Sequence, residues 1–275
     1  MNTRKIPRSG EELPVIGLGT WQTFDVGPSP AERASLLEVL RLFFAQGGRL
    51  IDSSPMYGRA EAVVGELLAE LRPTPPPFLA TKVWTNGRLK GEEQMRRSVA
   101  RMDRLGSGQV DLMQVHNLLD LRTHLPVLRD WKAAGKIRYL GITHYALQQL
   151  DELERLVRSE QLDFVQLPYS LAVRDAEKRL LPAAQATGTA VLVMRPFEEG
   201  ALFRRVRGLT LPPWAADFDC TSWAQFFLKF ILSHPAVTCP IPATASPAHM
   251  ADNLHAGLGR LPDEKTRQRM IQLLQ

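Results

Sequence analysis

Short apolar runs recur along the chain, and most are apolar at nearly every position. Runs that are apolar on both faces are typical of parallel strands buried on both sides. The first run is shorter than most of the others and lies close to the N-terminus. We therefore predict eight strands, at residues 15–18, 50–51, 78–83, 110–115, 139–142, 164–167, 190–194 and 237–241.

The segments between these runs have the spacing of amphipathic helices, with apolar residues every three or four positions. The clearest stripes lie within residues 36–44, 63–71, 147–157 and 223–231. From the second strand to the seventh, strands recur about every 25–32 residues, the length of one βαβ step. Eight strands alternating with helices predict an α/β fold, a (β/α)8 TIM barrel. No low-complexity linker divides the chain, so we expect a single domain over residues 1–275.

Two segments depart from this alternation. Residues 5–14, with Ser9-Gly10 at their centre, predict an N-terminal β-hairpin that closes the bottom of the barrel. The long interval 197–221, between the seventh and eighth strands, predicts a functional loop. A disordered surface insertion is the alternative for this interval.

Composition narrows the class of protein. The 275 residues are 44% hydrophobic and 23% charged, as expected for a soluble globular protein. The net charge of +5 could attract nucleic acid, but no nucleic-acid motif accompanies the basic residues, so a small anionic ligand is the better interpretation. The densest basic cluster is Arg204, Arg205 and Arg207. The chain has two cysteines without metal-ligand spacing, no signal peptide and no membrane-spanning run, which together predict a cytoplasmic protein. We expect a monomer without membrane or nucleic-acid partners.

Polar residues stand where the predicted strands end. In a TIM barrel the active site lies at the carboxyl ends of the strands. Packing alone does not explain why so many apolar runs carry a polar residue at or near this end. The residues in question are Asp52, Lys82, His116, Thr143, His144 and Gln166.

Lys82 stands within the apolar run FLATKVW. A buried lysine needs a charged partner or must lose its proton, and Asp52 at the end of a neighbouring strand is the obvious partner. Tyr57 follows Asp52 by five residues, in a loop that can fold back over the strand ends. A cationic lysine beside a tyrosine stabilises the phenolate, so Tyr57 could serve as a general acid.

Over essentially its full length the chain resembles the aldo-keto reductases. The segments that carry the resemblance are VIGLGTWQ, LIDSSPMYGRAEAVVGELL, FLATKVW, VDLMQVHNL, GKIRYLGITHY, FVQLPYS and CPIPATASPAHMADNL. The family consists of (β/α)8 barrels that reduce carbonyl compounds with a nicotinamide cofactor, usually NADPH. The resemblance implies a catalytic tetrad of Asp52, Tyr57, Lys82 and His116.

The resemblance also implies a cofactor site. Thr143, His144 and Gln166 would hold the nicotinamide carboxamide, and Phe197 would stack on the nicotinamide ring. The residues implied for the 2′-phosphate and adenine are Thr244, Ser246, His249 and Asn253. Relatives that prefer NADPH often carry Lys and Arg where this chain has Ala243 and His249, so we expect NADPH with NADH possible, and the Arg204–Arg207 cluster could supply the missing charge.

The expected substrate is a small-molecule aldehyde or ketone. Trp21, Phe24 and Trp84 follow strand ends and are candidate walls of an apolar substrate pocket, with plain packing as their alternative role. Two alternative functions stay open. One is a nucleotide-binding regulatory barrel that senses redox state with little turnover. The other is a metal enzyme with His116 and Asp52 as ligands, against which Lys82 argues because an ammonium group is no ligand; we expect no metal.

Overall fold

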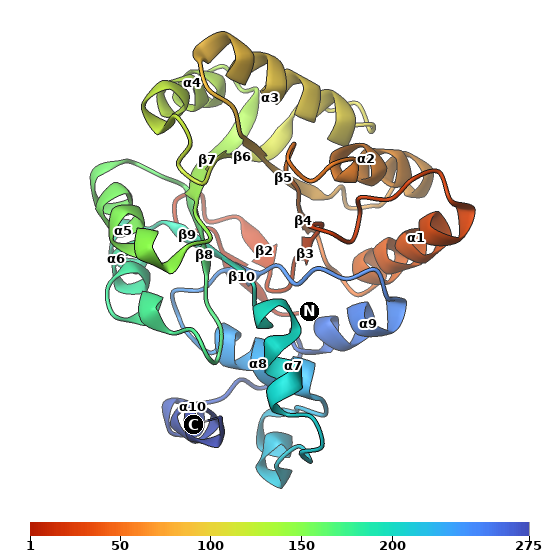
Figure 1. Cartoon of the computed structure of the whole chain (residues 1–275), viewed down its shortest axis with the longest axis vertical. Helices are drawn as coiled ribbons and strands as arrows, with labels where there is room; N and C mark the ends of the chain where they lie inside the picture. The colour runs from red at the N-terminus through yellow and green to blue at the C-terminus, as the bar shows by residue number, and fades with distance from the viewer. Residues whose placement is uncertain (275) are drawn as a thin grey trace.

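Eight parallel strands form the centre of the molecule and helices form an outer ring, in a computed structural model that describes residues 1–274 (Figure 1). The strands of the barrel are β3 (Leu18–Gly19), β4 (Leu50–Asp52), β5 (Phe78–Val83), β6 (Val110–His116), β7 (Ile137–Thr143), β8 (Phe164–Pro168), β9 (Ala190–Met194) and β10 (Cys239–Pro240). They lie in chain order, each parallel to the next. The (β/α)8 barrel predicted from the sequence is confirmed.

The predicted strands are all present, and β5 and β9 have the predicted bounds. The first and last strands are shorter than predicted, because they meet at the seam of the barrel. There the N–H groups of Gly17 and Gly19 donate to the carbonyl oxygens of Pro240 and Pro242, at 3.0 and 3.2 Å. The two prolines have no N–H to return, so the ladder along this seam remains short.

The barrel is closed at its bottom by the predicted hairpin. Strands β1 (Thr3–Lys5) and β2 (Glu12–Pro14) pair in antiparallel fashion. Side chains alternate between the two faces of a strand, so every second residue points into the barrel. Ile6 and Leu13 of the hairpin segment pack against inward-facing residues near the start of the strands, including Leu50, Phe78 and Phe164. The apolar plug leaves only the opposite end of the barrel for polar chemistry.

The helices α1 to α6, α8 and α9 follow one another around the ring in chain order, so that α9 comes to lie beside α1, whereas α10 lies apart from α9 (Figure 1). Their bounds are α1 (Pro30–Ala45), α2 (Ala60–Leu71), α3 (Arg88–Met102), α4 (Leu121–Ala133), α5 (Leu150–Ser159), α6 (Leu180–Thr187), α7 (Ala201–Arg205), α8 (Trp223–Leu232), α9 (Pro247–His255) and α10 (Glu264–Leu273). Short 3-10 helices are η1 (Leu147–Gln149), η2 (Asp175–Glu177), η3 (Glu198–Gly200) and η4 (Pro213–Phe218). The four predicted apolar stripes all fall on helices of this ring.

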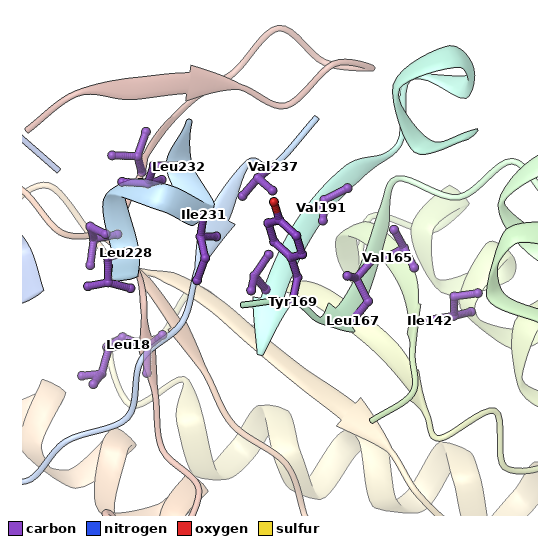
Figure 2. Close-up of a cluster of buried hydrophobic side chains, with 14 of the residues drawn as sticks. Leu18, Ile142, Val165, Leu167, Tyr169, Val191, Leu228, Ile231, Leu232 and Val237 are labelled. Atoms are coloured by element: carbon purple, nitrogen blue, oxygen red, sulfur yellow. The ribbon is translucent and has the colours of Figure 1, made fainter. Parts of the chain in front are cut away.

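Outward-facing strand residues pack against the apolar faces of the helices. Figure 2 shows part of this layer, where Val165 and Val191 of adjacent strands lie near Ile231 of α8 and the ring of Tyr169. All four residues are fully buried. The strands thus have one face in the helix layer and the other in the barrel, which explains their nearly continuous apolar sequence.

The interval 197–221 carries short helices, η3, α7 and η4. Arg204, Arg205 and Arg207 are exposed on this segment. It is followed by Ser222, whose hydroxyl accepts the N–H of Gln225 and caps α8. Among residues 1–274, no helix combines the length and apolar character needed to cross a membrane.

Candidate active site

A cavity of about 910 Å³ opens at the carboxyl ends of the strands. Ligand sites typically have volumes of about 300–1,000 Å³, so this cavity is at the upper end of that range. Most of the side chains singled out from the sequence line it. They are Trp21, Asp52, Tyr57, Lys82, His116, Thr143, Gln166, Phe197, Thr244, His249 and Asn253.

Four of the candidates do not line the cavity. Phe24 is fully buried in the hydrophobic core, and Trp84 is exposed with its ring 6.4 Å from that of His116. His144 is half-buried, and its Nδ1 accepts the N–H of Ala146 at 3.0 Å. Ser246 caps α9 by accepting the N–H of His249 at 3.4 Å.

The ion pair expected between strands β4 and β5 is present. Lys82 Nζ lies 2.7 Å from Asp52 Oδ2 and donates a second bond to the carbonyl oxygen of Ser53 at 2.6 Å. Lys82 is fully buried and Asp52 is 2% exposed. Burial alone would lower the pKa of Lys82, but the negative charge of Asp52 is the main cause that raises it above its usual value. Lys82 therefore remains a cation.

Two amide side chains complete the environment of Asp52. Gln114 Nε2 lies 3.4 Å from Asp52 Oδ1 and donates to Gln166 Oε1 at 2.9 Å, and Gln166 Nε2 lies 3.5 Å from Asp52 Oδ2. The sequence analysis did not identify Gln114. It stands in the middle of β6 rather than at its end, but a glutamine within the apolar run VDLMQVH was itself a signal. These contacts orient the carboxylate of Asp52.

Tyr57 lies beside both the cation and the imidazole. Its ring centroid is 5.3 Å from Lys82 Nζ and 5.9 Å from the ring of His116, which it meets edge-on. Burial raises the pKa of Tyr57 and Lys82 lowers it, with a net increase above the usual value. The direction of the lysine's effect agrees with the sequence analysis, but burial outweighs it. Tyr57 is consequently a protonated hydroxyl at neutral pH.

His116 is held neutral and in one orientation. Burial, with the positive charge of Lys82, lowers the pKa of His116 to about 3. Ser54 Oγ lies 3.0 Å from His116 Nδ1 and accepts the N–H of Met56 at 3.3 Å. The serine hydroxyl can donate its proton to Nδ1, and this arrangement goes with a proton on Nε2 of the imidazole. Ser54 was missed by the sequence analysis, although it lies within the motif IDSSPMYG.

The part of the cavity beside β7 and β8 offers polar atoms suited to an amide. Thr143 Oγ1 is buried and has no hydrogen-bond partner among the described residues. Buried hydroxyl groups are usually satisfied, so an unpartnered one in a cavity wall favours a polar ligand there. Gln166 lies next to Thr143, because the two residues are direct partners on the neighbouring strands β7 and β8. These residues fit the carboxamide of a nicotinamide ring.

The other part of the cavity is bounded by the loop after β10 and the first turn of α9. Thr244 is buried and its hydroxyl accepts the N–H of Ser246 at 3.0 Å, which leaves the hydroxyl proton available to a ligand. His249 is exposed and Asn253 is buried. Helix N-termini favour anions, so this turn fits a phosphate group. The three exposed arginines of the Arg204–Arg207 cluster are absent from the described cavity lining.

Comparisons with known proteins agree with this geometry. The sequence model of the Aldo/keto reductase family matches residues 15–269. The methylglyoxal reductase YeaE of Escherichia coli is 30% identical over 262 residues, which cover 92% of this chain and 89% of YeaE. The aldo-keto reductase YhdN of Bacillus subtilis is 29% identical over 74% of this chain, and the match spans 64% of the length of YhdN.

Two further matches bear on the cofactor. An NADH-specific methylglyoxal reductase of Escherichia coli is 28% identical over 72% of this chain and 69% of its own length. A crystal structure of an aldo/keto reductase from Klebsiella pneumoniae, in complex with NADP and acetate, superposes with a TM-score of 0.82 at 25% identity. The superposition covers all of this chain and 96% of that structure.

Proposed function

The chain belongs to the aldo/keto reductase family, and from that premise we propose the roles of its residues in the NAD(P)H-dependent reduction of aldehydes or ketones to alcohols. The observation that carries the proposal is the grouping of Asp52, Tyr57, Lys82 and His116 in one cavity, with the buried Lys82–Asp52 ion pair at 2.7 Å behind Tyr57. These residues come from three strands and one loop, so local packing does not account for the grouping.

When bound at this site, a dihydronicotinamide would supply the hydride that the carbonyl carbon accepts. Tyr57 gives its proton to the carbonyl oxygen, which becomes the hydroxyl of the alcohol. As the proton leaves, negative charge develops on the phenolate oxygen, and the cation of Lys82 stabilises that charge. Asp52 keeps Lys82 in place and ionised, so the stabilising charge is present before the reaction begins.

His116 acts through its Nε2 proton. A neutral imidazole with hydrogen on Nε2 donates to the carbonyl oxygen and draws electron density away from the carbon that accepts the hydride. Because the pKa of His116 is about 3, this donor is neutral throughout the physiological pH range. His116 therefore orients the substrate, and the transferred proton comes from Tyr57.

The cofactor is held by two groups of residues. Thr143 and Gln166 hold the carboxamide; His144, half-buried behind them, is proposed to help orient it, and Phe197 in the cavity wall to support the ring. Thr244, Ser246, His249 and Asn253 hold the adenosine phosphate. We propose NADPH as the preferred cofactor, by about ten- to a hundredfold in dissociation constant, which corresponds to about 1.4–2.7 kcal/mol. The modest preference reflects the absence of a lysine or arginine from this second group.

The substrate side of the cavity has an apolar entrance. Trp21 and Met56 line it and are 40% and 39% exposed, and Trp84 is 40% exposed next to His116. We propose that these side chains receive the carbon skeleton of a small carbonyl compound. The names of two relatives, both methylglyoxal reductases, make methylglyoxal the first compound to test.

Stopped-flow absorbance at the dihydronicotinamide band tests the proposal. Purified protein with bound NADPH is mixed with methylglyoxal and with a simple aromatic aldehyde. Rapid loss of the absorbance with formation of the alcohol supports the reductase. Tight binding of NADPH without turnover of any aldehyde in a broad panel would instead support the regulatory barrel. The cytoplasmic location and the monomeric state expected from the sequence belong to the same proposal. Analytical ultracentrifugation of the purified protein tests whether it is a monomer.

A further inference from the structure

The charges on the cavity wall are few and mostly paired. Among the described lining residues, Lys82 and Arg195 are the lysine and arginine side chains. The charge of Lys82 is neutralised by Asp52, with which it forms a buried ion pair. Arg195 is thus the cation that remains for an anionic ligand. A dinucleotide brings two phosphates into this cavity, so the position of Arg195 matters for its binding.

Arg195 follows β9 directly and lies between the two groups of proposed cofactor residues. In sheet order β9 lies between β8, which carries Gln166, and β10, which leads to Thr244 and α9. A molecule that reaches from the carboxamide residues to the adenosine residues must pass the end of β9. The central part of a nicotinamide dinucleotide, between its two nucleosides, is the pyrophosphate.

The guanidinium of Arg195 is held at this place from two sides. It forms an ion pair with Glu199, four residues later, and its central carbon lies 5.9 Å from the ring centroid of Tyr145. Tyr145 follows β7, so the side chain of Arg195 extends across the end of β8. The side chain is 36% exposed and that of Glu199 is 47% exposed. Both side chains line the cavity, and each is partly exposed.

The backbone around the ion pair is unusual. Arg195, Glu198 and Glu199 have φ values of 54°, 51° and 51°, in the left-handed region that non-glycine residues rarely adopt. A hydrogen bond closes the turn, in which the N–H of Glu198 donates to the carbonyl oxygen of Arg195 at 3.1 Å. Such conformations persist where the surrounding structure imposes them, and they concentrate at ligand sites. Here the turn brings the carboxylate of Glu199 back to the guanidinium.

We propose that Arg195 binds the pyrophosphate of the cofactor and that Glu199 is its resident counterion, which yields the guanidinium to the phosphates. This inference rests on the proposed function, since it concerns the same cavity. An arginine fork can bind two phosphate oxygens at once, in a geometry that neither lysine nor histidine reproduces. The carboxylate of Glu199 can turn to solvent, because nearly half of its side chain is already exposed. Arg195 would then act equally on NADPH and NADH, which share the pyrophosphate.

Isothermal titration calorimetry of three ligands isolates the contact. NADPH, NADH and ADP-ribose all contain the pyrophosphate, but ADP-ribose lacks the nicotinamide, and only NADPH has the 2′-phosphate. Arg195→Gln should raise all three dissociation constants by the same factor, about ten- to a hundredfold. Arg195→Lys should give an intermediate loss, because it keeps the charge without the fork. Glu199→Gln should tighten all three ligands by about threefold, because it removes the competing carboxylate.

Arg205→Gln is the matched control. Arg205 is exposed on α7 and is absent from the described cavity lining, so all three dissociation constants should stay within twofold of the wild type. The proposal is overturned if Arg195→Gln leaves binding unchanged, weakens NADPH alone or spares ADP-ribose, or if Glu199→Gln weakens binding. Thermal unfolding verifies that the variants fold. A wild-type protein that binds none of the three ligands would refute the proposed function itself, which is a different result.

Discussion

His116 shows how much of the chemistry is set by the surroundings of one side chain. Its imidazole lies between the cation of Lys82 and the hydroxyl of Ser54, with the ring of Tyr57 at 5.9 Å. Burial and the nearby cation remove its charge, and the proposed hydrogen bond from the serine selects its tautomer. The same residue in water would be half protonated near pH 6.5 and would exist in both tautomers. A pH-sensitive group thus becomes a permanent neutral donor.

This neutrality has a consequence for stability. The pKa of His116 is about 3 in the folded protein and about 6.5 in the unfolded chain, so the unfolded state binds more protons between these values. Its contribution to stability is present above pH 6.5 and is lost as the pH falls toward 3. Between pH 7 and pH 5 this amounts to about 2 kcal/mol. Urea unfolding at both pH values measures how far the free energy of unfolding falls between pH 7 and pH 5. This fall should be about 2 kcal/mol smaller in His116→Asn than in the wild type. Equal falls in the two proteins would contradict the assigned pKa.

The tautomer of His116 gives a second prediction at this scale. Ser54→Ala removes the hydroxyl that donates to Nδ1, so the proton is no longer confined to Nε2. We expect kcat to fall about fivefold, the equivalent of one hydrogen bond of about 1 kcal/mol. Nitrogen NMR of 15N-histidine-labelled protein should show the Nε2–H form in the wild type and in Ser54→Thr, which keeps the hydroxyl. An unchanged tautomer in Ser54→Ala would show that the serine does not select it.

At the scale of elements, the ion pair ties two adjacent strands. Asp52 ends β4 and pairs in the sheet with Ala80, and Lys82 lies two residues further along β5 on the same inward face. Alternation along each strand therefore places the two charges in the same layer of the barrel. This is why the pair could be predicted from the sequence once the strands were recognised.

Lys82→Met should destabilise the protein, because it leaves the carboxylate of Asp52 buried without its cation. Breaking a buried pair from one side typically costs about 3–5 kcal/mol. The double variant Asp52→Asn/Lys82→Met removes both charges and should recover part of the loss. Chemical denaturation of the two variants measures this. If Lys82→Met were as stable as the wild type, the pair would not be charged as described.

Helix α9 carries the weakest part of the predicted cofactor site. The 2′-phosphate bears nearly two negative charges, and arginine meets such a group through two parallel bonds. His249→Arg should lower the dissociation constant of NADPH about tenfold and leave that of NADH nearly unchanged. His255→Arg, exposed at the far end of the same helix, is the control and should change neither. An equal effect of His249→Arg on both cofactors would place the 2′-phosphate elsewhere.

Some features at this scale could not be predicted from the sequence. Ser54 and Gln114 act on Asp52 and His116 through side-chain contacts between segments about 60 residues apart, and spacing along the chain carries no record of such contacts. The Arg204–Arg207 cluster was considered as a source of the missing charge, but its arginines are exposed and absent from the described cavity lining. Arg195, which the sequence analysis passed over, lines the cavity instead because of an unusual turn after β9.

For the whole molecule, the barrel is what converts separate strand ends into one site. The four proposed catalytic residues span positions 52 to 116, while the proposed cofactor residues extend to position 253. Closure of the sheet between β3 and β10 brings both sets to one rim (Figure 1). Periodicity and strand spacing were enough to predict this architecture. They could not predict the depth of each side chain, so Phe24, expected in the pocket, packs in the core.

The central claim is that Tyr57 donates the proton within this assembled site, and single-turnover hydride transfer in Tyr57→Phe tests it most directly. The variant keeps the ring beside Lys82 and His116 and removes only the hydroxyl, so the dissociation constant of NADPH should stay within a few-fold of the wild type. The rate of absorbance loss on mixing with a saturating aldehyde should fall at least about a hundredfold, because general acids typically contribute factors of about 10²–10⁴. A rate close to that of the wild type would contradict the account.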